Sequence, residues 1–194
     1  MPANKIRKPT ILENLIVDGS KLNTGPNSST PLTGMTVLSQ ALVPQLEDVR
    51  FSAFDLEATD NGDSTGGFYG GAMFKLPATR IVLLGAFLDL TILSVEAGIA
   101  ADATLAVAVG TAIATDATHT GGQVNIIASA PISLTGGAGA AEFNGIVALT
   151  YLDVVSATSV YLNIGIPDAD ISADAALNAT GVFRMVYLDI SDGE

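Results

Sequence analysis

TLAVAVGTAI, residues 104–113, shows the pattern that indicates the fold class most directly. Leu105, Val107 and Val109 alternate with smaller residues, so an extended chain would carry the three large aliphatic side chains on one face. Alternation with a period of two is typical of a β-strand that buries one face. The sequence therefore predicts a strand here.

Comparable runs of β-branched and aromatic residues, separated by Gly, Asp and Pro, recur from residue 68 onward. Residues 80–95, RIVLLGAFLDLTILSV, could form two short strands or one long strand bent at Gly85. About seven or eight strands at this spacing predict an all-β fold, a jelly-roll-like β-sandwich. The predicted strands are residues 51–57, 68–76, 80–95, 104–113, 123–129, 142–154, 159–166 and 181–190.

The second face of the 104–113 strand carries small residues, Ala106 and Ala108. A solvated strand face usually carries Lys and Glu. A small-residue face can instead lie flat against another sheet or a sister subunit, and the sequence leaves both partners open.

Residues 1–64 differ in composition from the rest and predict an extended N-terminal arm, followed by a sandwich domain over 65–194. Residues 19–34 have a turn-and-coil composition without periodicity. Apolar residues at helical spacing between Met35 and Leu42, ended by Pro44, predict a possible short helix. The isolated apolar residues of the arm cannot bury enough surface to fold alone.

Charge and hydropathy exclude several functions. The net charge is −12 with only 8 Lys and Arg, which argues against nucleic acid as a partner. No apolar run approaches the length of a membrane span, and no signal peptide is evident in MPANKIRKPTILENL. We expect synthesis in the cytoplasm, no membrane partner, and a charge-poor surface that is partly covered by other protein chains.

The usual catalytic groups are scarce, so we expect neither enzyme activity nor a cofactor. There is no Cys, and the single histidine, His119, is expected to be an exposed loop residue without a role. Paired carboxylates, as in glycosidases, remain conceivable because the chain has 20 acidic residues, but nothing marks one pair above another.

Calcium is the metal ion for which the sequence offers the best candidate ligands. In DADISAD, Asp168, Asp170 and Asp174 follow the spacing of a calcium-binding loop, with Ser172 between them. The loop lacks the glycine and the glutamate that such loops need, so a turn stabilised by hydrogen bonds to local N–H groups is the better interpretation. A second, weaker candidate is the acidic loop that contains Asp60, Asn61 and Asp63.

AVAVGTAIATDAT (106–118) and VYLNIGIPDADISADAALNATGVFRMVYLDI (160–190) resemble segments of virion proteins of tailed bacteriophages. Those proteins are decoration, or cement, proteins and other head-associated structural proteins. The resemblance covers residues 100–190 and leaves residues 1–64 without a counterpart.

The resemblance implies a jelly-roll body that forms homotrimers on the outer surface of the virion and clamps neighbouring copies of the major capsid protein. Within such a role the N-terminal arm is the candidate capsid-binding element, with basic and apolar side chains for an acidic capsid patch. Its candidate residues are Lys5, Ile6, Arg7, Lys8, Ile11, Leu12, Leu15 and Ile16.

Other functions remain open at this point. The chain could be a head-fibre or tail-associated virion protein that binds host-surface glycans. It could also be a carbohydrate-binding sandwich or a glycosidase, although it has no Trp for sugar stacking. A soluble acidic monomer with a Thr- and Ala-rich surface is the simplest alternative.

Overall fold

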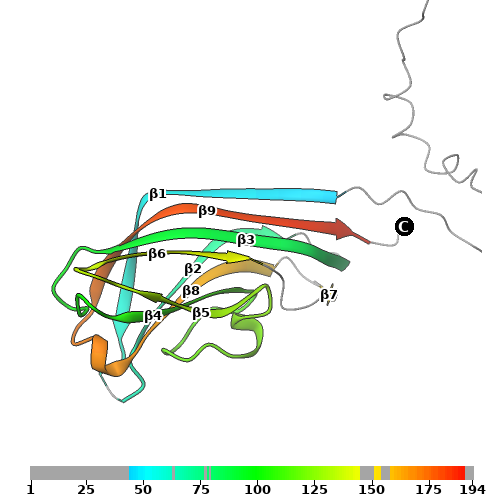
Figure 1. Cartoon of the computed structure of the whole chain (residues 1–194). Helices are drawn as coiled ribbons and strands as arrows, with labels where there is room; N and C mark the ends of the chain where they lie inside the picture. The colour runs from blue at the N-terminus through cyan, green and yellow to red at the C-terminus, as the bar shows by residue number, and fades with distance from the viewer. Residues whose placement is uncertain are drawn as a thin grey trace, which may run out of the picture. The chain divides into compact units, whose positions relative to one another are not determined.

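The computed structural model describes residues 44–62, 64–76, 78, 80–144, 151–153 and 158–190. These described residues form an all-β body, shown in Figure 1, in which the only helices are two 3-10 turns. No helix in this part of the chain has the length and hydropathy needed to span a bilayer.

The described elements have the following bounds. The strands are β1 (Pro44–Asp60), β2 (Gly67–Leu76), β3 (Arg80–Ser94), β4 (Thr104–Gly110), β5 (Ile127–Ser133), β6 (Ala138–Asn144), β7 (Tyr151–Asp153), β8 (Thr158–Ile166) and β9 (Ala175–Asp189). The 3-10 turns are η1 (Gly121–Gln123) and η2 (Asp168–Asp170).

The strand order is that of a jelly roll. The strands run β5-β4-β8-β2-β1-β9-β3-β6, every ladder is antiparallel, and the short β7 pairs with β3. Leaving β7 aside, the first strand pairs with the last, the second with the second-last, and so on to the central pair β4 and β5. One long antiparallel ribbon wound around a core produces this nesting, with two Greek keys. The predicted all-β, jelly-roll-like fold is confirmed.

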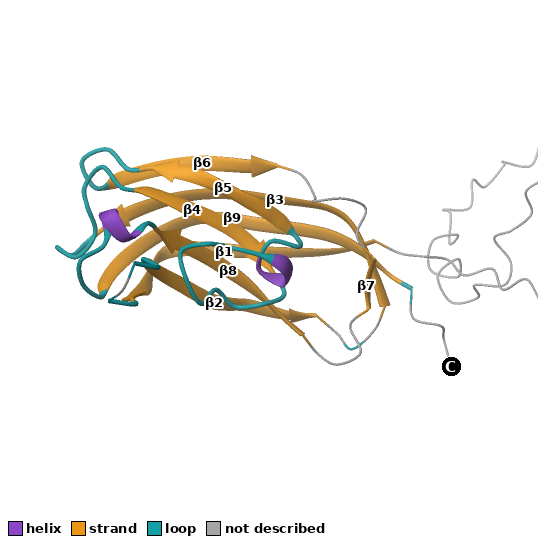
Figure 2. Ribbon diagram, turned by 90° about the horizontal axis from the view of Figure 1, so that it is seen from below, coloured by secondary structure: helices purple, strands orange, loops and turns teal. Residues whose placement is uncertain are grey.

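Two packed layers follow from this order. We call β1-β9-β3-β6 sheet A and β2-β8-β4-β5 sheet B, and Figure 2 shows the two layers from below. The alternating aliphatic residues of both sheets point inward, as Leu88 and Leu90 of β3 and Leu162 and Ile164 of β8 illustrate, all almost fully buried. The Phe74 and Phe183 rings stack across the core with centroids 6.1 Å apart.

β1 belongs to the body and not to an arm. It pairs with β9 from Pro44 to Ala58 and then with β2 at Thr59 and Asp60, so it joins the two sheets. The expected arm boundary at residue 64 was therefore wrong for residues 44–60, whose alternation is weak because much of β1 lies at an open side of the sandwich. Residues 1–43, including the predicted short helix, lie outside the described residues.

β3 and β5 differ in how well the sequence predicted them. β3 is one continuous strand with a register shift between Leu83 and Gly85, as in the bent-strand alternative. The strand predicted at 123–129 begins four residues later, at Ile127, because residues up to Ile126 belong to the long loop that leaves β4.

The region predicted as one strand over 142–154 contains the end of β6 and the separate strand β7. Residues 145–150 between them lie outside the described part of the chain. β6 and β7 both pair with β3, at different positions along it.

The loop of residues 111–126 covers part of the outer face of sheet B. There, Ala108, Asn163 and Gly70 lie side by side on β4, β8 and β2. Asn163 is fully buried and accepts a hydrogen bond from the Ala114 N–H while donating to the carbonyls of Ala112 and Gln123.

Glycines allow the same loop to approach the sheet closely. A side chain at Gly165 would collide with the backbone of Ala117, and one at Gly110 with the backbone of Gly122 and Gln123. Ala108 is accordingly fully buried. The small-residue face predicted from Ala106 and Ala108 therefore meets a loop of the same chain at Ala108, and neither of the two partners expected from the sequence is needed there.

Candidate binding groove

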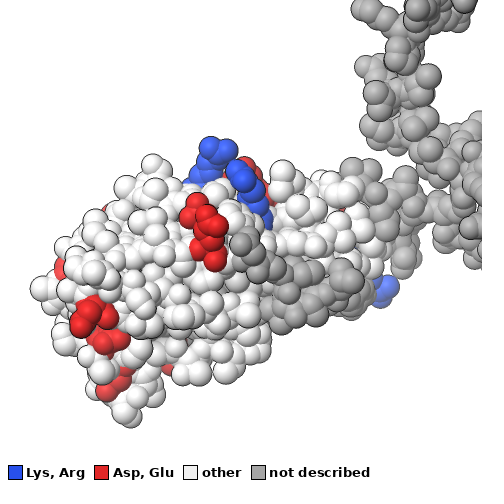
Figure 3. Space-filling model, viewed as in Figure 1, with Lys and Arg blue, Asp and Glu red and all other residues white. Residues whose placement is uncertain are grey.

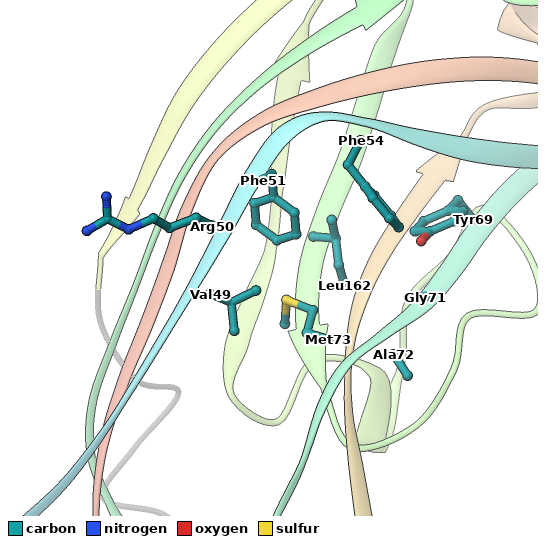
Figure 4. Close-up of a pocket in the computed structure, with 9 residues that line it drawn as sticks. All are labelled: Val49, Arg50, Phe51, Phe54, Tyr69, Gly71, Ala72, Met73 and Leu162. Carbon is teal, nitrogen blue, oxygen red and sulfur yellow. The ribbon is translucent and has the colours of Figure 1, made fainter.

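An apolar groove opens where β1 and β2 separate. The two strands pair only at Thr59–Phe68 and Asp60–Gly67, after which β1 continues along β9 and β2 along β8. Inward-facing side chains are left accessible along this seam, in a cavity of about 150 Å³. Its lining residues, drawn in Figure 4, are Val49, Arg50, Phe51, Phe54, Tyr69, Gly71, Ala72, Met73 and Leu162.

A bulge in β1 shapes one wall of the groove. The register of β1 against β9 shifts between Phe51 and Phe54, and Ala53 has a φ of 50°. Positive φ is uncommon for a residue with a Cβ, and such strained positions cluster at binding sites. The bulge places Phe54 opposite the buried Ala179, on the inward side, yet 51% of Phe54 remains exposed because β2 has moved away.

Tyr69 of β2 forms the facing wall, with its ring toward Phe54 in Figure 4. The Tyr69 hydroxyl lies over Gly71, where a side chain would collide with it. Burial raises the pKa of Tyr69 above its usual value. Met73 and Leu162 also line the cavity and complete a surface suited to apolar side chains.

Polar groups lie along the β1–β9 ladder beside the groove. The Tyr187 hydroxyl donates to Glu47 Oε1 at 3.3 Å, and burial followed by the charge of Glu47 raises the pKa of Tyr187. Asp48 forms ion pairs with Arg50 at 3.6 Å and with Arg184 at 3.4 Å. The Arg50 guanidinium points away from the other lining side chains in Figure 4. The groove can thus bind an apolar segment, while its lining offers no nucleophile paired with a base.

The predicted arm residues cannot be placed. Lys5, Ile6, Arg7, Lys8, Ile11, Leu12, Leu15 and Ile16 all lie outside the described residues. Their role as a capsid-binding element remains a prediction.

Two of the three candidate calcium ligands, Asp170 and Asp174, accept hydrogen bonds from different segments of the chain. Asp170 Oδ2 accepts from the Thr104 N–H at 3.2 Å, and Asp174 Oδ1 accepts from the Asp60 N–H at 2.7 Å. Among the described residues, no three metal-ligating side chains form a cluster, and Asp168 is one of those residues. These aspartates connect segments far apart in the sequence, whereas hydrogen bonds to local N–H groups were expected.

The second acidic loop, in contrast, is held by hydrogen bonds within the loop. Asp60 Oδ1 accepts from the Gly62 N–H at 3.0 Å, and the Asn61 amide donates to Thr65 Oγ1 at 3.0 Å. Asp63 lies outside the described residues.

His119 is not the exposed residue that was expected. It is half-buried in the loop over sheet B, with Nδ1 3.4 Å from Ser129 Oγ and with Nε2 buried without a hydrogen-bond partner. Burial lowers the pKa of His119, opposed by the charge of Asp116.

Sequence reasoning missed the groove residues Phe54, Tyr69 and Met73. All three lie in segments with strand patterns, where an apolar side chain is normally part of the core. The unusual signal was the pair of polar positions around Phe54, Ser52 and Asp55, which does not fit a two-sided buried strand.

The known proteins that this chain resembles are found among solved structures. No family model matches the sequence, and no curated protein sequence matches it. Two similar solved structures are of VP2 of infectious bursal disease virus: a D431N mutant in T=1 particles (TM-score 0.41, 12% identity) and a subviral particle (TM-score 0.38, 12% identity). The D431N mutant aligns with 84% of this chain over 36% of its own length, and the subviral particle aligns with 83% of this chain over 37% of its own length. This chain therefore spans about a third of the length of VP2.

A third similar structure is the acid-stable capsid of Helicobacter pylori bacteriophage KHP30 (TM-score 0.27, 12% identity, 74% of this chain, 93% of that chain). These TM-scores are low, so the class of fold rests on the nested strand ladders alone. By that criterion the chain is an all-β jelly-roll protein with an open apolar groove.

Proposed function

We propose that this chain is a structural, non-enzymatic protein of a virus particle. In this proposal it decorates the outer surface of a tailed-phage head as a homotrimer and ties adjacent major capsid proteins together. Such a protein works mechanically, because linked subunits make many weak contacts at high effective concentration. The sequence resemblance of residues 100–190 supports the proposal, and so does the nested jelly-roll order.

The observation that carries the proposal is the groove between β1 and β2. Phe54 and Tyr69 face each other across a cavity lined mainly by apolar side chains. Exposed apolar surface along the seam where the described parts of β1 and β2 separate is suited to an extended segment of a partner protein. We propose that an extended apolar segment of the major capsid protein occupies it.

The test compares two aspartate variants of the full chain, Phe54→Asp in the groove and Val95→Asp outside it. Val95 is 49% exposed and follows β3, so it matches Phe54 in exposure but not in location. Heads of the encoding phage that lack this protein are mixed with each variant and sedimented. Wild type and Val95→Asp should saturate the heads, and Phe54→Asp should bind at least about tenfold more weakly, a loss of about 1.4 kcal/mol.

Thermal unfolding of both variants controls for folding. If wild-type protein leaves heads undecorated, the cement function fails. If it then binds host cells or glycans, the chain acts as a fibre component. Equal binding by Phe54→Asp and wild type would exclude the groove as the docking site.

The arm is tested separately in the full chain with Lys5→Glu, Arg7→Glu and Lys8→Glu combined. If the basic arm contacts an acidic capsid patch, this variant should decorate heads more weakly, with a smaller dependence on salt than wild type. A variant that binds as wild type does would remove the arm from the proposal. Deletions that test the arm should end before Pro44, because β1 begins there.

A further inference from the structure

The outer face of sheet A has too many apolar side chains for a solvated sheet face. The outward positions of β3 and β9 include Phe87, Leu93, Val182 and Val186, which are half-buried or exposed. Leu46 of β1 is 62% exposed on the same face, opposite Val186. Sheet faces that meet water usually alternate to polar residues, so this face is suited to contact with another protein surface.

Charges of opposite sign lie at the two ends of one row of residues on this face. One row of neighbouring residues runs Arg50, Val182, Asp89, Glu142 from β1 to β6. Arg184 of β9 lies beside this row. Around this row the cations Arg50 and Arg184 belong to β1 and β9, and the carboxylates Asp89 and Glu142 belong to β3 and β6. Farther along the same face, β1 also carries Asp55 and Glu57, and β3 begins with Arg80.

The cationic end also includes one acid. Asp48, opposite Arg184, forms ion pairs with both arginines, so this group of three side chains carries one net positive charge. Arg50 is 75% exposed and therefore free to reach a further partner. Figure 3 shows basic side chains grouped over β1 and β9 on a surface that is otherwise largely uncharged.

A row that is positive at one end and negative at the other is complementary to itself. If a second copy faces sheet A across a two-fold axis parallel to the strands, β1 lies over β6 of that copy, and β9 over β3. Arg50 then faces Glu142 of the second copy, and Arg184 comes beside Asp89. Each contact occurs twice, because such an interface is isologous.

We infer that the outer face of sheet A binds the same face of a second copy of this chain, in this two-fold arrangement. Four strands about 4.8 Å apart, paired over about ten residues at about 3.3 Å each, cover roughly 600 Å² per copy. The total of roughly 1,200 Å² is at the lower end of specific interfaces. The inference is independent of the proposed cement function, since the contact joins two copies whether they come from single chains or from trimers.

Charge exchange between the two ends of the row tests the inference in the full chain. Arg50→Glu and Glu142→Lys alone each place like charges together twice per interface, so each should raise the dissociation constant at least about tenfold in analytical ultracentrifugation. The double variant Arg50→Glu, Glu142→Lys should restore association. A mixture of the two single variants should form a mixed pair by native mass spectrometry, because its contacts are again complementary.

Lys75→Glu is the matched control, since it makes the same charge change at an exposed position of β2 in sheet B. It should associate as wild type does. Failure of the double variant to restore association, or an equal loss in Lys75→Glu, would overturn the inference. So would a trimer that none of these variants affects, a result that leaves the cement proposal standing. A different result would refute the cement proposal alone. In that result, the charge variants change self-association as expected, but the wild-type protein does not bind to heads.

Discussion

The side chain of Asn163 accepts a hydrogen bond from the backbone N–H of Ala114, with its Oδ1 2.9 Å from that nitrogen. Through this contact a fully buried strand residue fixes a loop that begins after the neighbouring strand β4. The Asn163 amide also donates to the carbonyls of Ala112 and Gln123, both at 3.0 Å. One side chain thus satisfies three backbone groups of the loop, which explains how a long loop lies closely over sheet B.

Replacement of Asn163 by alanine should release this loop. The three hydrogen bonds contribute about 1 kcal/mol each, so we expect Asn163→Ala to lower the free energy of unfolding by about 3 kcal/mol in urea denaturation. Hydrogen exchange of residues 111–126 should accelerate more than exchange of the sheet. Asn178→Ala removes a single exposed bond to Asp55 and should cost less than about 1 kcal/mol. Equal losses in the two variants would contradict the anchoring role.

Gly165 should tolerate no side chain, because the backbone of Ala117 occupies that space. Gly165→Ala is expected to lower the free energy of unfolding by about 1–3 kcal/mol, the usual range for overpacking. Gly85 in β3 is the control, because a Cβ there meets nothing within 4 Å. Gly85→Ala should be neutral or stabilise the protein by up to about 1 kcal/mol. Thermal and chemical unfolding of both variants would check this difference.

Ala53 holds the β1 bulge at a cost that glycine should remove. Its φ of 50° lies in the region where a Cβ is unfavourable, by roughly 1–2 kcal/mol per residue. Ala53→Gly should therefore raise the free energy of unfolding, by up to about 1 kcal/mol after the entropy cost of glycine. The same change at the exposed Ala140 of β6 should lower it by about 0.5–1 kcal/mol. A loss of stability in Ala53→Gly would show that the bulge is not strained.

His119 should make folding stability depend on pH. Burial lowers its pKa in the folded state below the unfolded value of about 6.5, so the unfolded chain binds a proton more readily. The stability that neutral His119 contributes to the folded state is fully present above about pH 6.5. It is lost as the pH falls through the lower pKa of the folded state. His119→Asn should flatten the slope of unfolding free energy between about pH 7 and 5. An unchanged slope in this variant would assign the pH dependence to other groups.

Much of the fold could be predicted from local patterns. The strands expected at 68–76 and 159–166 match β2 (Gly67–Leu76) and β8 (Thr158–Ile166) to within one residue. Gly67 begins β2, Pro77 follows it, and Pro167 follows β8; the backbone preferences of these residues act without help from distant residues. The start of β5 was misplaced because the 3-10 turn η1 and the loop after it contain residues that also suit a strand.

The alternation of apolar residues in the sequence is enough to predict β-strands with one buried face, since the period of side-chain direction along a strand is a local property. The order of those strands, the burial of Ala108 under residues 111–126, and the groove between Phe54 and Tyr69 were decided only by the tertiary structure. Each depends on which distant segments meet, and β1 illustrates this point. Its sequence is compatible with an exposed arm, and only its pairing with β9 and then with β2 makes it the strand that joins the two sheets.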